Sequence, residues 1–394
     1  MYATYSFSNV CLIGHLFAPI GCGENVRCSF RALRAVAATP TLLDLYGYYK
    51  PDADAHREFE PHLRNTPAAI NIFHINGDEV ELALATLADM LPKHSYNIVY
   101  PNWELSRYPH DWARQLDRFD EIWAPSAFVH AALIPVVTKL VVRVTLASEV
   151  MLSSFRSRRY FGIPESAYAF LFFFDFRSFA ARKNPQAVIR AFRQLRLQRP
   201  ASNAYLVIKV HGGEAAPEAL TQLQDSLSDL RDSVVLINRS MDDNDTKNLV
   251  RLCDCFVSLH RSEGFGRGLA EAMYLGKPVI ATRYSGNLDF MDDATAYLID
   301  YSLVPVRSGE YPFAESQEWA DADSGHAAAC MAELLDDPDL GRQMGRAASI
   351  AVRRRIGWRT SGMRYRERIE SIMKTLRGSS KTHESSLRNP AHLK

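Results

Sequence analysis

Two acidic residues with seven positions between them, Glu263 and Glu271, form a pair that could bind a ligand rich in hydroxyl groups. A carboxylate can accept hydrogen bonds from two neighbouring hydroxyls, which suits a ribose diol or a sugar ring. Phe265, Gly266 and Arg267 lie between them, and their backbone amides would suit a phosphate if a helix begins there. These groups together describe a nucleotide-sugar site, although an ordinary loop with a solvated glutamate would contain the same residues.

The elements around the two glutamates have the order strand, loop, helix, strand. A run of apolar, β-type residues at 255–259 indicates a buried strand, and a turn-rich loop follows at 260–266. Apolar residues recur at helical spacing over 267–275, Gly276 ends this helix, and the next strand spans 279–281. In such a unit a ligand binds at the carboxyl ends of the strands and at the first turn of the helix.

The stretch EGFGRGLAEAMYLGKPVIAT, which begins at Glu263, resembles the E-x7-E signature of the retaining glycosyltransferase family 4. The resemblance extends to the residues SGN at 285–287 and to Phe290. It implies an α/β protein with the GT-B fold, in which two Rossmann-like domains face a crevice and bind a nucleotide-sugar. It also implies that Glu263 contacts the donor sugar ring and that Glu271 holds the ribose diol.

A basic segment between a predicted strand and a predicted helix contains Arg177, Arg182 and Lys183. Cations at a strand end and a helix start can form a pocket for a diphosphate, or they can belong to a solvated loop. Family 4 enzymes carry an arginine and a lysine six positions apart here, so the resemblance assigns Arg177 and Lys183 to the donor phosphates, with Arg182 as a competitor. By offsetting charge on the leaving diphosphate, Arg177 and Lys183 would act with Glu263 as the catalytic residues.

Two further candidates concern the donor. Gly21 and Gly23 lie between a predicted strand at 8–13 and a predicted helix at about 25–36, where glycines either form a tight turn or let a phosphate approach. The resemblance implies that such a loop closes over the donor diphosphate and faces the acceptor. By the same resemblance, the loop that contains Met241 would run beneath the nucleotide base.

The acceptor side is predicted from the first half of the chain. Trp103 and Glu104 follow a predicted strand at 97–100, and Trp112 is close in sequence. Aromatic faces stack on sugar rings, but both tryptophans fit a hydrophobic core equally well. The sequence Trp-Glu-Leu resembles one branch of family 4, which assigns Glu104 to the acceptor. His74 follows the strand at 69–73, at an edge where ligand sites collect, and is a second acceptor-side candidate beside its structural alternative.

A chain of 394 residues is long enough for two domains, each with its own core. We predict an acceptor-side domain at 1–150 and a nucleotide-sugar-binding domain at 151–355. An amphipathic pattern predicts that a helix at 356–377 returns to the first domain, as in GT-B proteins. The polar composition of 378–394 predicts a flexible tail.

We expect neither a metal nor a cofactor. No Asp-x-Asp motif stands at a convincing site, so the phosphate charge would be met by side chains and a helix dipole. The six cysteines include no C-x-x-C pair, which favours reduced, structural thiols. The N-terminus lacks a basic n-region and a cleavage site, and its apolar run is too short to span a bilayer, which predicts a cytoplasmic protein.

The formal net charge of +1 hides a strong asymmetry. Residues 342–394 contain 14 Lys and Arg against 3 Asp and Glu, a net charge of +11, which leaves −10 for the rest of the chain. A basic end suggests an anionic partner such as phospholipid or nucleic acid, or a solvated helix that lies against the acidic remainder. We expect peripheral contact with an anionic membrane and no nucleic acid.

The sequences WEL and SLHRSEGFG resemble mannosyltransferases and related hexosyltransferases of bacterial surface polysaccharide synthesis. The resemblance suggests GDP-mannose as the donor, a glycan or lipid-linked acceptor, and transfer with retention of anomeric configuration. One alternative is a non-catalytic subunit that binds a nucleotide-sugar, although the intact set of Glu263, Glu271, Arg177 and Lys183 argues against it. Another alternative is a different GT-B enzyme, such as an epimerase or a phosphorylase.

Overall fold

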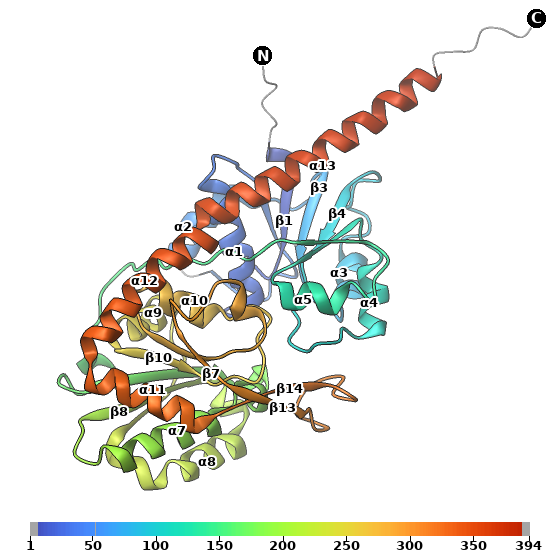
Figure 1. Ribbon diagram of the computed structural model, residues 1–394. Helices are drawn as coiled ribbons and strands as arrows, with labels where there is room; N and C mark the ends of the chain where they lie inside the picture. The colour runs from blue at the N-terminus through green and yellow to red at the C-terminus, as the bar shows by residue number, and fades with distance from the viewer. Residues whose placement is uncertain (1–6, 52, 388–394) are drawn as a thin grey trace, which may run out of the picture.

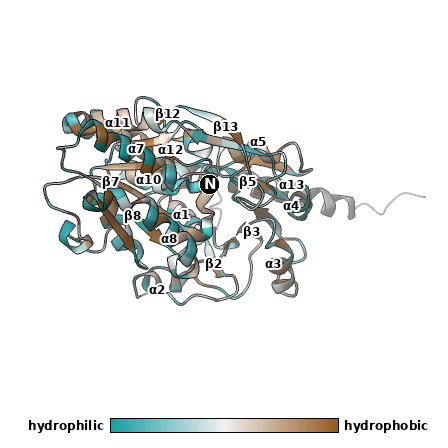
Figure 2. Ribbon diagram, turned by 90° about the horizontal axis from the view of Figure 1, so that it is seen from below, coloured by the Kyte–Doolittle hydropathy of each residue, from teal (hydrophilic) through white to brown (hydrophobic). Residues whose placement is uncertain are grey.

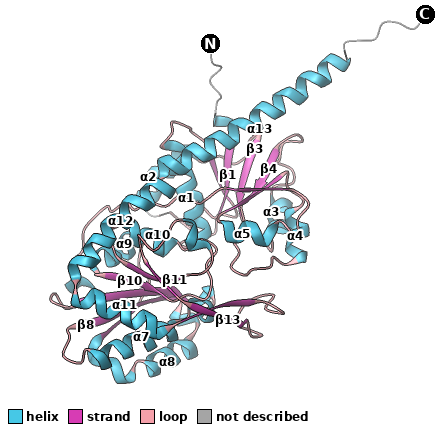
Figure 3. Ribbon diagram, in the orientation of Figure 1, coloured by secondary structure: helices cyan, strands magenta, loops and turns pink. Residues whose placement is uncertain are grey.

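Two parallel β-sheets, one in each half of the chain, form the framework of the protein (Figures 1 and 3). The structure is a computed structural model that describes residues 7–51 and 53–387. Helices alternate with the strands in both halves, which is the order that places helices on the faces of a parallel sheet. The predicted α/β architecture with two Rossmann-like domains is therefore confirmed.

The first sheet has the strand order β2-β1-β3-β4-β5-β6. Its strands are β1 (Val10–Gly14), β2 (Thr41–Asp44), β3 (Ile70–His74), β4 (Tyr96–Val99), β5 (Glu121–Ala124) and β6 (Leu140–Arg143). The helices of this domain are α1 (Gly21–Arg34), α2 (Ala53–Phe59), α3 (Val80–Thr86), α4 (His110–Leu116) and α5 (Ala127–Leu133). The central strands β1 and β3 are buried along their whole length, as continuous apolar runs require in a sheet covered on both faces. The sequence did not predict the two edge strands, β2 and β6.

The second sheet has the strand order β12-β11-β10-β7-β8-β9. Its strands are β7 (Tyr168–Asp175), β8 (Ala204–His211), β9 (Val234–Asn238), β10 (Cys255–Ser258), β11 (Val279–Thr282) and β12 (Tyr297–Ile299). The helices are α6 (Ala180–Lys183), α7 (Pro185–Gln198), α8 (Pro217–Ser226), α9 (Asp243–Leu252), α10 (Arg267–Tyr274), α11 (Ser324–Asp336) and α12 (Pro338–Ile356). The order reverses between β7 and β10, and loops at such a switch point form the ligand site in open α/β sheets.

An antiparallel hairpin follows the second sheet and was not predicted from the sequence. Its strands are β13 (Tyr301–Pro305) and β14 (Glu318–Ala322), and Figure 1 shows them extending from the second domain below the first. Between the strands, the ring of Tyr311 lies 5.7 Å from that of Trp103, and the ring of Phe313 lies 5.2 Å from that of Trp112. The hairpin therefore packs its aromatic residues against the first domain.

The last helix, α13 (Trp358–Leu387), leaves the second domain and crosses the first (Figure 1). The backbone amide of Ala147 donates to the Tyr365 hydroxyl at 3.1 Å, and the Arg368 guanidinium donates to the buried carboxylate of Glu121. A Cβ atom on Gly362 would lie 2.0 Å from the carbonyl oxygen of Ala32, so glycine permits the close approach of α13 to α1. The predicted return of the final helix to the first domain is confirmed.

Helix α13 is longer than predicted. It continues through residues 378–387, where the sequence predicted the start of a flexible tail. Extending a helix costs less free energy than nucleating one, and no proline interrupts the sequence from Trp358 to Leu387. The rest of the predicted tail, 388–394, lies outside the described residues.

The two connections between the domains lie side by side. Residues 144–157 lead from β6 toward β7, and the backbone amide of Ser148 donates to the carbonyl of Ile356, the last residue of α12, at 2.9 Å. The Glu149 carboxylate accepts a hydrogen bond of 2.8 Å from the amide of Trp358, the first residue of α13. The outgoing and returning segments of the chain are therefore bonded to each other where they cross.

Hydrophobic residues are concentrated in the strands. In Figure 2 strands such as β3 and β7 are mostly brown, while α2 and α8 carry hydrophilic residues in teal. One apolar cluster continues between the domains and includes Leu146, Phe265 and Tyr365. Within the described ranges, no helix combines the length and the apolar character needed to cross a lipid bilayer.

Candidate active site

The loop before α10 lies against the first domain. It follows β10 and ends at Gly266, whose φ of 93° is left-handed, so α10 begins at Arg267 as predicted. A Cβ atom on Gly264 would lie 2.6 Å from the carbonyl oxygen of Trp103, which requires a glycine beside the first-domain segment. In the described part of the chain, the amides of Phe265, Gly266 and Arg267 donate no hydrogen bond. They therefore remain available to an anion.

Glu263 lies in a cluster of charges contributed by two segments of the second domain. Its carboxylate accepts a hydrogen bond from the Lys183 ammonium and lies 3.1 Å from the guanidinium of Arg182. Burial alone would raise the pKa of Glu263, but Lys183 and Arg182 lower it to about 2. Burial lowers the pKa of Lys183, and the neighbouring Arg182 lowers it further. Glu263 is thus held ionised between two cations.

The backbone around α6 explains why these two cations point inward. Phe179, before the helix, and Asn184, after it, both have left-handed φ values, 61° and 54°. The chain therefore turns sharply at both ends of a four-residue helix. The carbonyl of Arg182 accepts a hydrogen bond of 2.8 Å from the amide of Arg261, which fixes α6 to the loop that contains Glu263.

Arg177 does not join this cluster. Its guanidinium pairs with Asp175 at the end of β7, at 2.8 Å, and its side chain is 48% exposed. The sequence predicted that Arg177 and Lys183 act together on the donor phosphates, with Arg182 as a competitor. The structure places Arg182 beside Lys183, because the sharp turn before α6 separates Arg177 from both. A contact between Arg177 and the donor phosphates stays a prediction.

Glu104, the predicted acceptor-side residue, reaches the same cluster from the first domain. Its carboxylate lies 3.9 Å from the Arg182 guanidinium and accepts a hydrogen bond from the Tyr311 hydroxyl. Arg182 therefore faces two carboxylates, Glu104 and Glu263, from different domains. Trp103 is only 1% exposed and packs edge to face against Trp112, so its ring belongs to the hydrophobic core.

Glu271 is buried in α10 and its carboxylate has no hydrogen-bond partner among the described residues. Burial raises its pKa to about 7, although the nearby Lys247 opposes this effect. Lys247 is itself 2% exposed and pairs with Asp243 at 2.5 Å. A buried carboxylate with free acceptor atoms is the arrangement that the predicted contact with a ribose diol requires.

Two polar contacts join the second domain to the first near Glu271. Lys247 lies 3.9 Å from the carboxylate of Glu24 in α1. The guanidinium of Arg267 donates to the side-chain oxygen of Asn25 at 2.5 Å. The side chain of Arg267 therefore binds the first domain, while the sequence prediction for this residue concerned its backbone amide.

The other donor-side candidates lie at the edge of this region. Helix α1 begins at Gly21, earlier than predicted, so both glycines lie in its first turn. A Cβ atom on Gly23 would lie 2.4 Å from the carbonyl oxygen of Ala18, whereas one on Gly21 would meet nothing within 4 Å. A glycine at position 23 therefore permits close packing against the preceding loop, whereas the space beside Gly21 is open. Met241 is half-buried after β9.

His74 ends β3 and is 1% exposed, and neither ring nitrogen has a hydrogen-bond partner among the described residues. Its ring lies 5.2 Å from that of Tyr100. Burial lowers the pKa of His74 to about 3, and Arg267 contributes to the shift, so the imidazole is neutral. Its acceptor role stays a prediction.

Sequence reasoning missed Lys247, Tyr311 and Gln317. Lys247 lies on a polar helix, DNDTKNLVRL, in which nothing local distinguishes a buried lysine from a solvated one. The other two lie in the β13–β14 hairpin, whose strands are short. No three or more His, Cys, Asp or Glu side chains are grouped as metal ligands in the part of the chain that is described, and all six cysteines are free thiols.

A comparison with known protein families matches residues 162–302 to the family "Glycosyl transferases group 1". This region contains β7 to β12, Lys183, Glu263 and Glu271. The resemblance of this region to a group 1 glycosyl transferase is thereby confirmed. The match ends at the start of the β13–β14 hairpin.

Curated relatives include D-inositol 3-phosphate glycosyltransferases from Arthrobacter sp. (strain FB24) and Thermobispora bispora. The first is 28% identical over 204 residues, which cover 52% of this chain and 42% of the relative. The second is 28% identical over 229 residues, 56% of this chain and 48% of the relative. The aligned region thus spans less than half the length of these relatives.

Solved structures with the same fold cover nearly the whole chain. The Anabaena protein HepE in complex with UDP and glucose has a TM-score of 0.66 at 14% identity, over 92% of this chain and 99% of HepE. Sucrose-phosphate synthase from Thermosynechococcus elongatus has a TM-score of 0.66 at 14% identity, over 93% of this chain and 99% of the synthase. The predicted GT-B fold is confirmed.

Proposed function

From the group 1 glycosyl transferase domain at residues 162–302 and the GT-B fold, we propose that this protein is a glycosyltransferase. It moves a hexosyl unit from a nucleotide-sugar to an acceptor hydroxyl. The observation that carries the proposal is the contrast between Glu263 and Glu271. Glu263 is ionised between Lys183 and Arg182, and Glu271 is buried on the adjoining helix with free acceptor atoms.

In the proposed reaction, an acceptor oxygen attacks the anomeric carbon while the bond to the leaving diphosphate oxygen breaks. The proton of the acceptor passes to the leaving phosphate, and the anomeric configuration is retained. Lys183 offsets the negative charge that builds on the diphosphate, Arg177 is expected to add to this effect, and the free amides before α10 contribute their dipoles. The reaction needs no metal in this proposal, so it should persist in the presence of a chelator.

The donor is a hexose linked to a nucleoside diphosphate, and GDP-mannose is the donor that we propose. UDP-sugars are the competing class, because HepE, which shares the fold, was solved with UDP and with UDP-glucose. A panel of GDP- and UDP-sugars separates the two classes, since a ligand at 100 times its dissociation constant stabilises a protein by about 2.7 kcal/mol. The donor should be the sugar nucleotide that raises the unfolding temperature most.

The decisive experiment measures release of nucleoside diphosphate with and without an acceptor. A transferase releases it rapidly only when an acceptor is added, and the sugar appears in the product with unchanged anomeric configuration. An epimerase would instead convert the donor sugar with no acceptor, and a non-catalytic subunit would bind the donor and leave it intact. Either of these results would replace the proposal by the corresponding alternative.

We propose a glycan or a lipid-linked glycan as the acceptor and a location at the cytoplasmic face of an anionic membrane. The outer surface of α12 and α13 carries exposed cations with no ion-pair partner among the described residues, namely Arg346, Arg354, Arg359 and Lys374. Arg355, by contrast, pairs with Asp292 of the second domain, and Arg353 stacks on Tyr274. The unpaired cations support contact with anionic lipid headgroups.

A further inference from the structure

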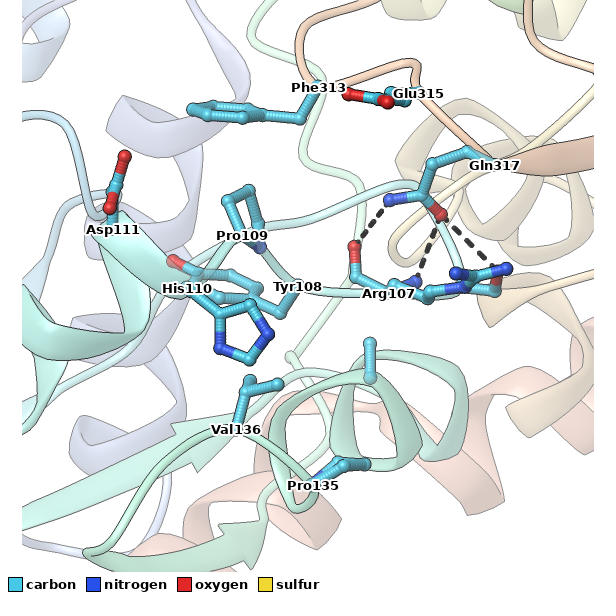
Figure 4. Close-up of a pocket in the computed structure, with 12 residues that line it drawn as sticks. Arg107, Tyr108, Pro109, His110, Asp111, Pro135, Val136, Phe313, Glu315 and Gln317 are labelled. Atoms are coloured by element: carbon cyan, nitrogen blue, oxygen red, sulfur yellow. Dashed lines mark hydrogen bonds between the residues drawn. The ribbon is translucent and has the colours of Figure 1, made fainter.

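A groove of about 450 Å³ lies between the β13–β14 hairpin and the first domain (Figure 4). The hairpin contributes Phe313, Glu315 and Gln317, and the first domain contributes the segment 106–111, Ala132 of α5, and Pro135 and Val136 after that helix. Because both domains form its walls, the groove exists only where the hairpin reaches the first domain. It lies outside the region that matches the group 1 family.

Gln317 fixes the two walls relative to each other. Its side-chain nitrogen donates to the carbonyl of Arg107 at 2.7 Å, and its side-chain oxygen accepts from the amide of Arg107 at 3.2 Å. Figure 4 shows these bonds beside the groove. Gln317 is 5% exposed, so both bonds are shielded from water. These two hydrogen bonds therefore hold the two walls of the groove at a fixed separation.

The groove combines an aromatic face with unused hydrogen-bonding groups. The ring of Phe313 is 45% exposed and stands opposite Tyr108 and Pro109 in Figure 4. The side chains of Arg107, His110 and Glu315 are exposed, and none has a hydrogen-bond partner in the described part of the chain. An exposed ring beside free donors and acceptors is the surface that a sugar ring requires, because its CH face is apolar and its edge carries hydroxyls.

The groove is connected to the candidate active site through the hairpin. Tyr311 points inward and donates to Glu104, while Phe313, two residues later, lines the groove. The ring of Trp103 contacts both, with centroid distances of 5.7 Å to Tyr311 and 6.4 Å to Phe313. Trp103 is buried, so a chain of sugars that enters at the groove would have to pass over this aromatic layer to reach Glu104.

We propose that this groove binds a neutral sugar unit of an oligosaccharide acceptor, next to the unit that receives the transferred sugar. The proposal rests on the proposed glycosyltransferase function. Opposite charges on Arg107 and Glu315 favour hydroxyls over a phosphate or an acidic sugar, because an anion would meet Glu315 and Asp111 as well as the cation. The protein thus selects an acceptor of at least two sugar units.

Direct binding tests the proposal without depending on transfer. Saturation-transfer NMR and calorimetry would measure maltose, cellobiose, mannobiose and diacetylchitobiose, with glucose 6-phosphate as the anionic probe. At least one neutral disaccharide should bind, and Phe313→Ala should weaken it about tenfold, equivalent to about 1.4 kcal/mol. Phe155→Ala removes a ring that is 74% exposed in the linker and should leave the affinity unchanged.

Thermal stabilisation of Phe313→Ala by nucleotide shows whether the variant is folded. It also tests nucleotide binding, which belongs to the proposed function, separately from sugar binding in the groove. Glu315→Gln gives a second variant that keeps the ring and should weaken disaccharide binding while leaving nucleotide binding intact. The proposal is overturned if no neutral disaccharide binds, if glucose 6-phosphate binds more tightly, or if Phe313→Ala binds as the wild type does. None of these results would contradict the proposed glycosyltransferase function, which is contradicted only if nucleotide-sugars do not bind or react.

Discussion

The Tyr311 hydroxyl donates a hydrogen bond to the Glu104 carboxylate, and this bond joins the hairpin of the second domain to the first domain. A hydrogen bond to a charged group contributes about 1.5–3 kcal/mol. We predict that Tyr311→Phe lowers kcat/KM for transfer by about tenfold or more and leaves nucleotide affinity unchanged. Tyr301→Phe, on the same hairpin but with its ring against Tyr284, is the matched control and should retain full activity.

A double-mutant cycle distinguishes positioning of Glu104 from a general loss of structure. If Tyr311 acts by orienting Glu104, then Tyr311→Phe should have little further effect in a Glu104→Gln background. Additive losses in kcat/KM would show that the two residues act independently and would contradict the prediction.

The second prediction concerns Lys183. Negative charge on the leaving diphosphate grows in the transition state, so Lys183→Ala should lower kcat more than it raises the KM of the donor. Steady-state kinetics with varied donor would measure both constants. A rise in KM alone would mean that Lys183 binds ground state and transition state equally.

Substitutions of Arg182 and Arg177 should have different effects. Arg182 is 5% exposed and lies between Glu104 and Glu263, so Arg182→Ala removes a buried cation that two carboxylates share and should lower the free energy of unfolding by about 3–5 kcal/mol. Arg177→Ala removes a half-exposed side chain and should affect turnover without changing stability. Urea unfolding of both variants measures this difference, and equal stabilities would remove the structural role of Arg182.

A further prediction tests the ribose contact. Glu271→Gln replaces a carboxylate acceptor by an amide and should weaken the nucleoside diphosphate and the intact donor by equal factors, about 1.5–3 kcal/mol each. Calorimetric titration with both ligands measures the two losses. Unchanged affinity for the nucleoside diphosphate would show that Glu271 does not contact the ribose. A loss of affinity confined to the intact donor would show that Glu271 contacts the sugar instead.

The opposite pKa shifts of the two glutamates predict opposite stability changes. The pKa of Glu271 rises from 4.5 to about 7, so the wild type loses stability as pH increases between these values, and Glu271→Gln should gain relative stability over the same interval. The pKa of Glu263 falls to about 2, so its contribution is complete above about pH 4.5 and is lost only in stronger acid. Glu263→Gln should therefore be less stable by about 3 kcal/mol, and equally so across pH 5–8.

Denaturant unfolding at several pH values between about 5 and 8 compares each variant with the wild type. The relative stability of Glu271→Gln should increase through the interval, and that of Glu263→Gln should stay flat and negative. Parallel curves for the two variants would show that the environments of the two carboxylates do not differ as the structure indicates.

The last prediction concerns the membrane. Reversing Arg354 and Arg359 to glutamate should abolish sedimentation with anionic vesicles at low salt, because each cation near such a surface contributes about 1 kcal/mol. Reversing the exposed Arg190 and Arg231, which lie away from α13, is the matched control and should leave sedimentation unchanged. Equal binding of the wild type to neutral and anionic vesicles, or equal loss in both double variants, would remove α12 and α13 as the membrane-facing surface.

Local patterns predicted the part of the site that is contiguous in sequence. The order of strand, loop and helix around Glu263 and Glu271 follows from apolar spacing and from glycines at fixed positions, and α10 begins at the predicted residue. The central strands of both sheets and the return of the final helix were also predictable, because each depends on an apolar period or on the resemblance to a known fold. These features depend on short-range rules that a single sequence expresses.

The choice between Arg177 and Arg182 was not predictable in the same way. It is decided by left-handed backbone at Phe179 and Asn184; asparagine favours this conformation, but no sequence rule assigns it to a phenylalanine. Tyr311 reaches Glu104 across more than half of the chain length, so no local period places them together. Lys247 is buried beside the Glu24 carboxylate of the first domain. Whether a lysine can be buried depends on such a partner, which local sequence does not reveal.

The bonded crossing of the two chain segments determines how the crevice can open. Residues 144–157 and the junction of α12 with α13 are joined by the contacts of Ser148 and Glu149, so the two chain crossings between the domains are bonded to each other. Figure 1 shows this junction on the left and the hairpin on the right of the molecule. Any separation of the domains at the hairpin would have to break the bonds of Tyr311 to Glu104 and of Gln317 to Arg107. Because the hairpin and the first domain each supply one wall of the groove, the groove would be lost together with these bonds.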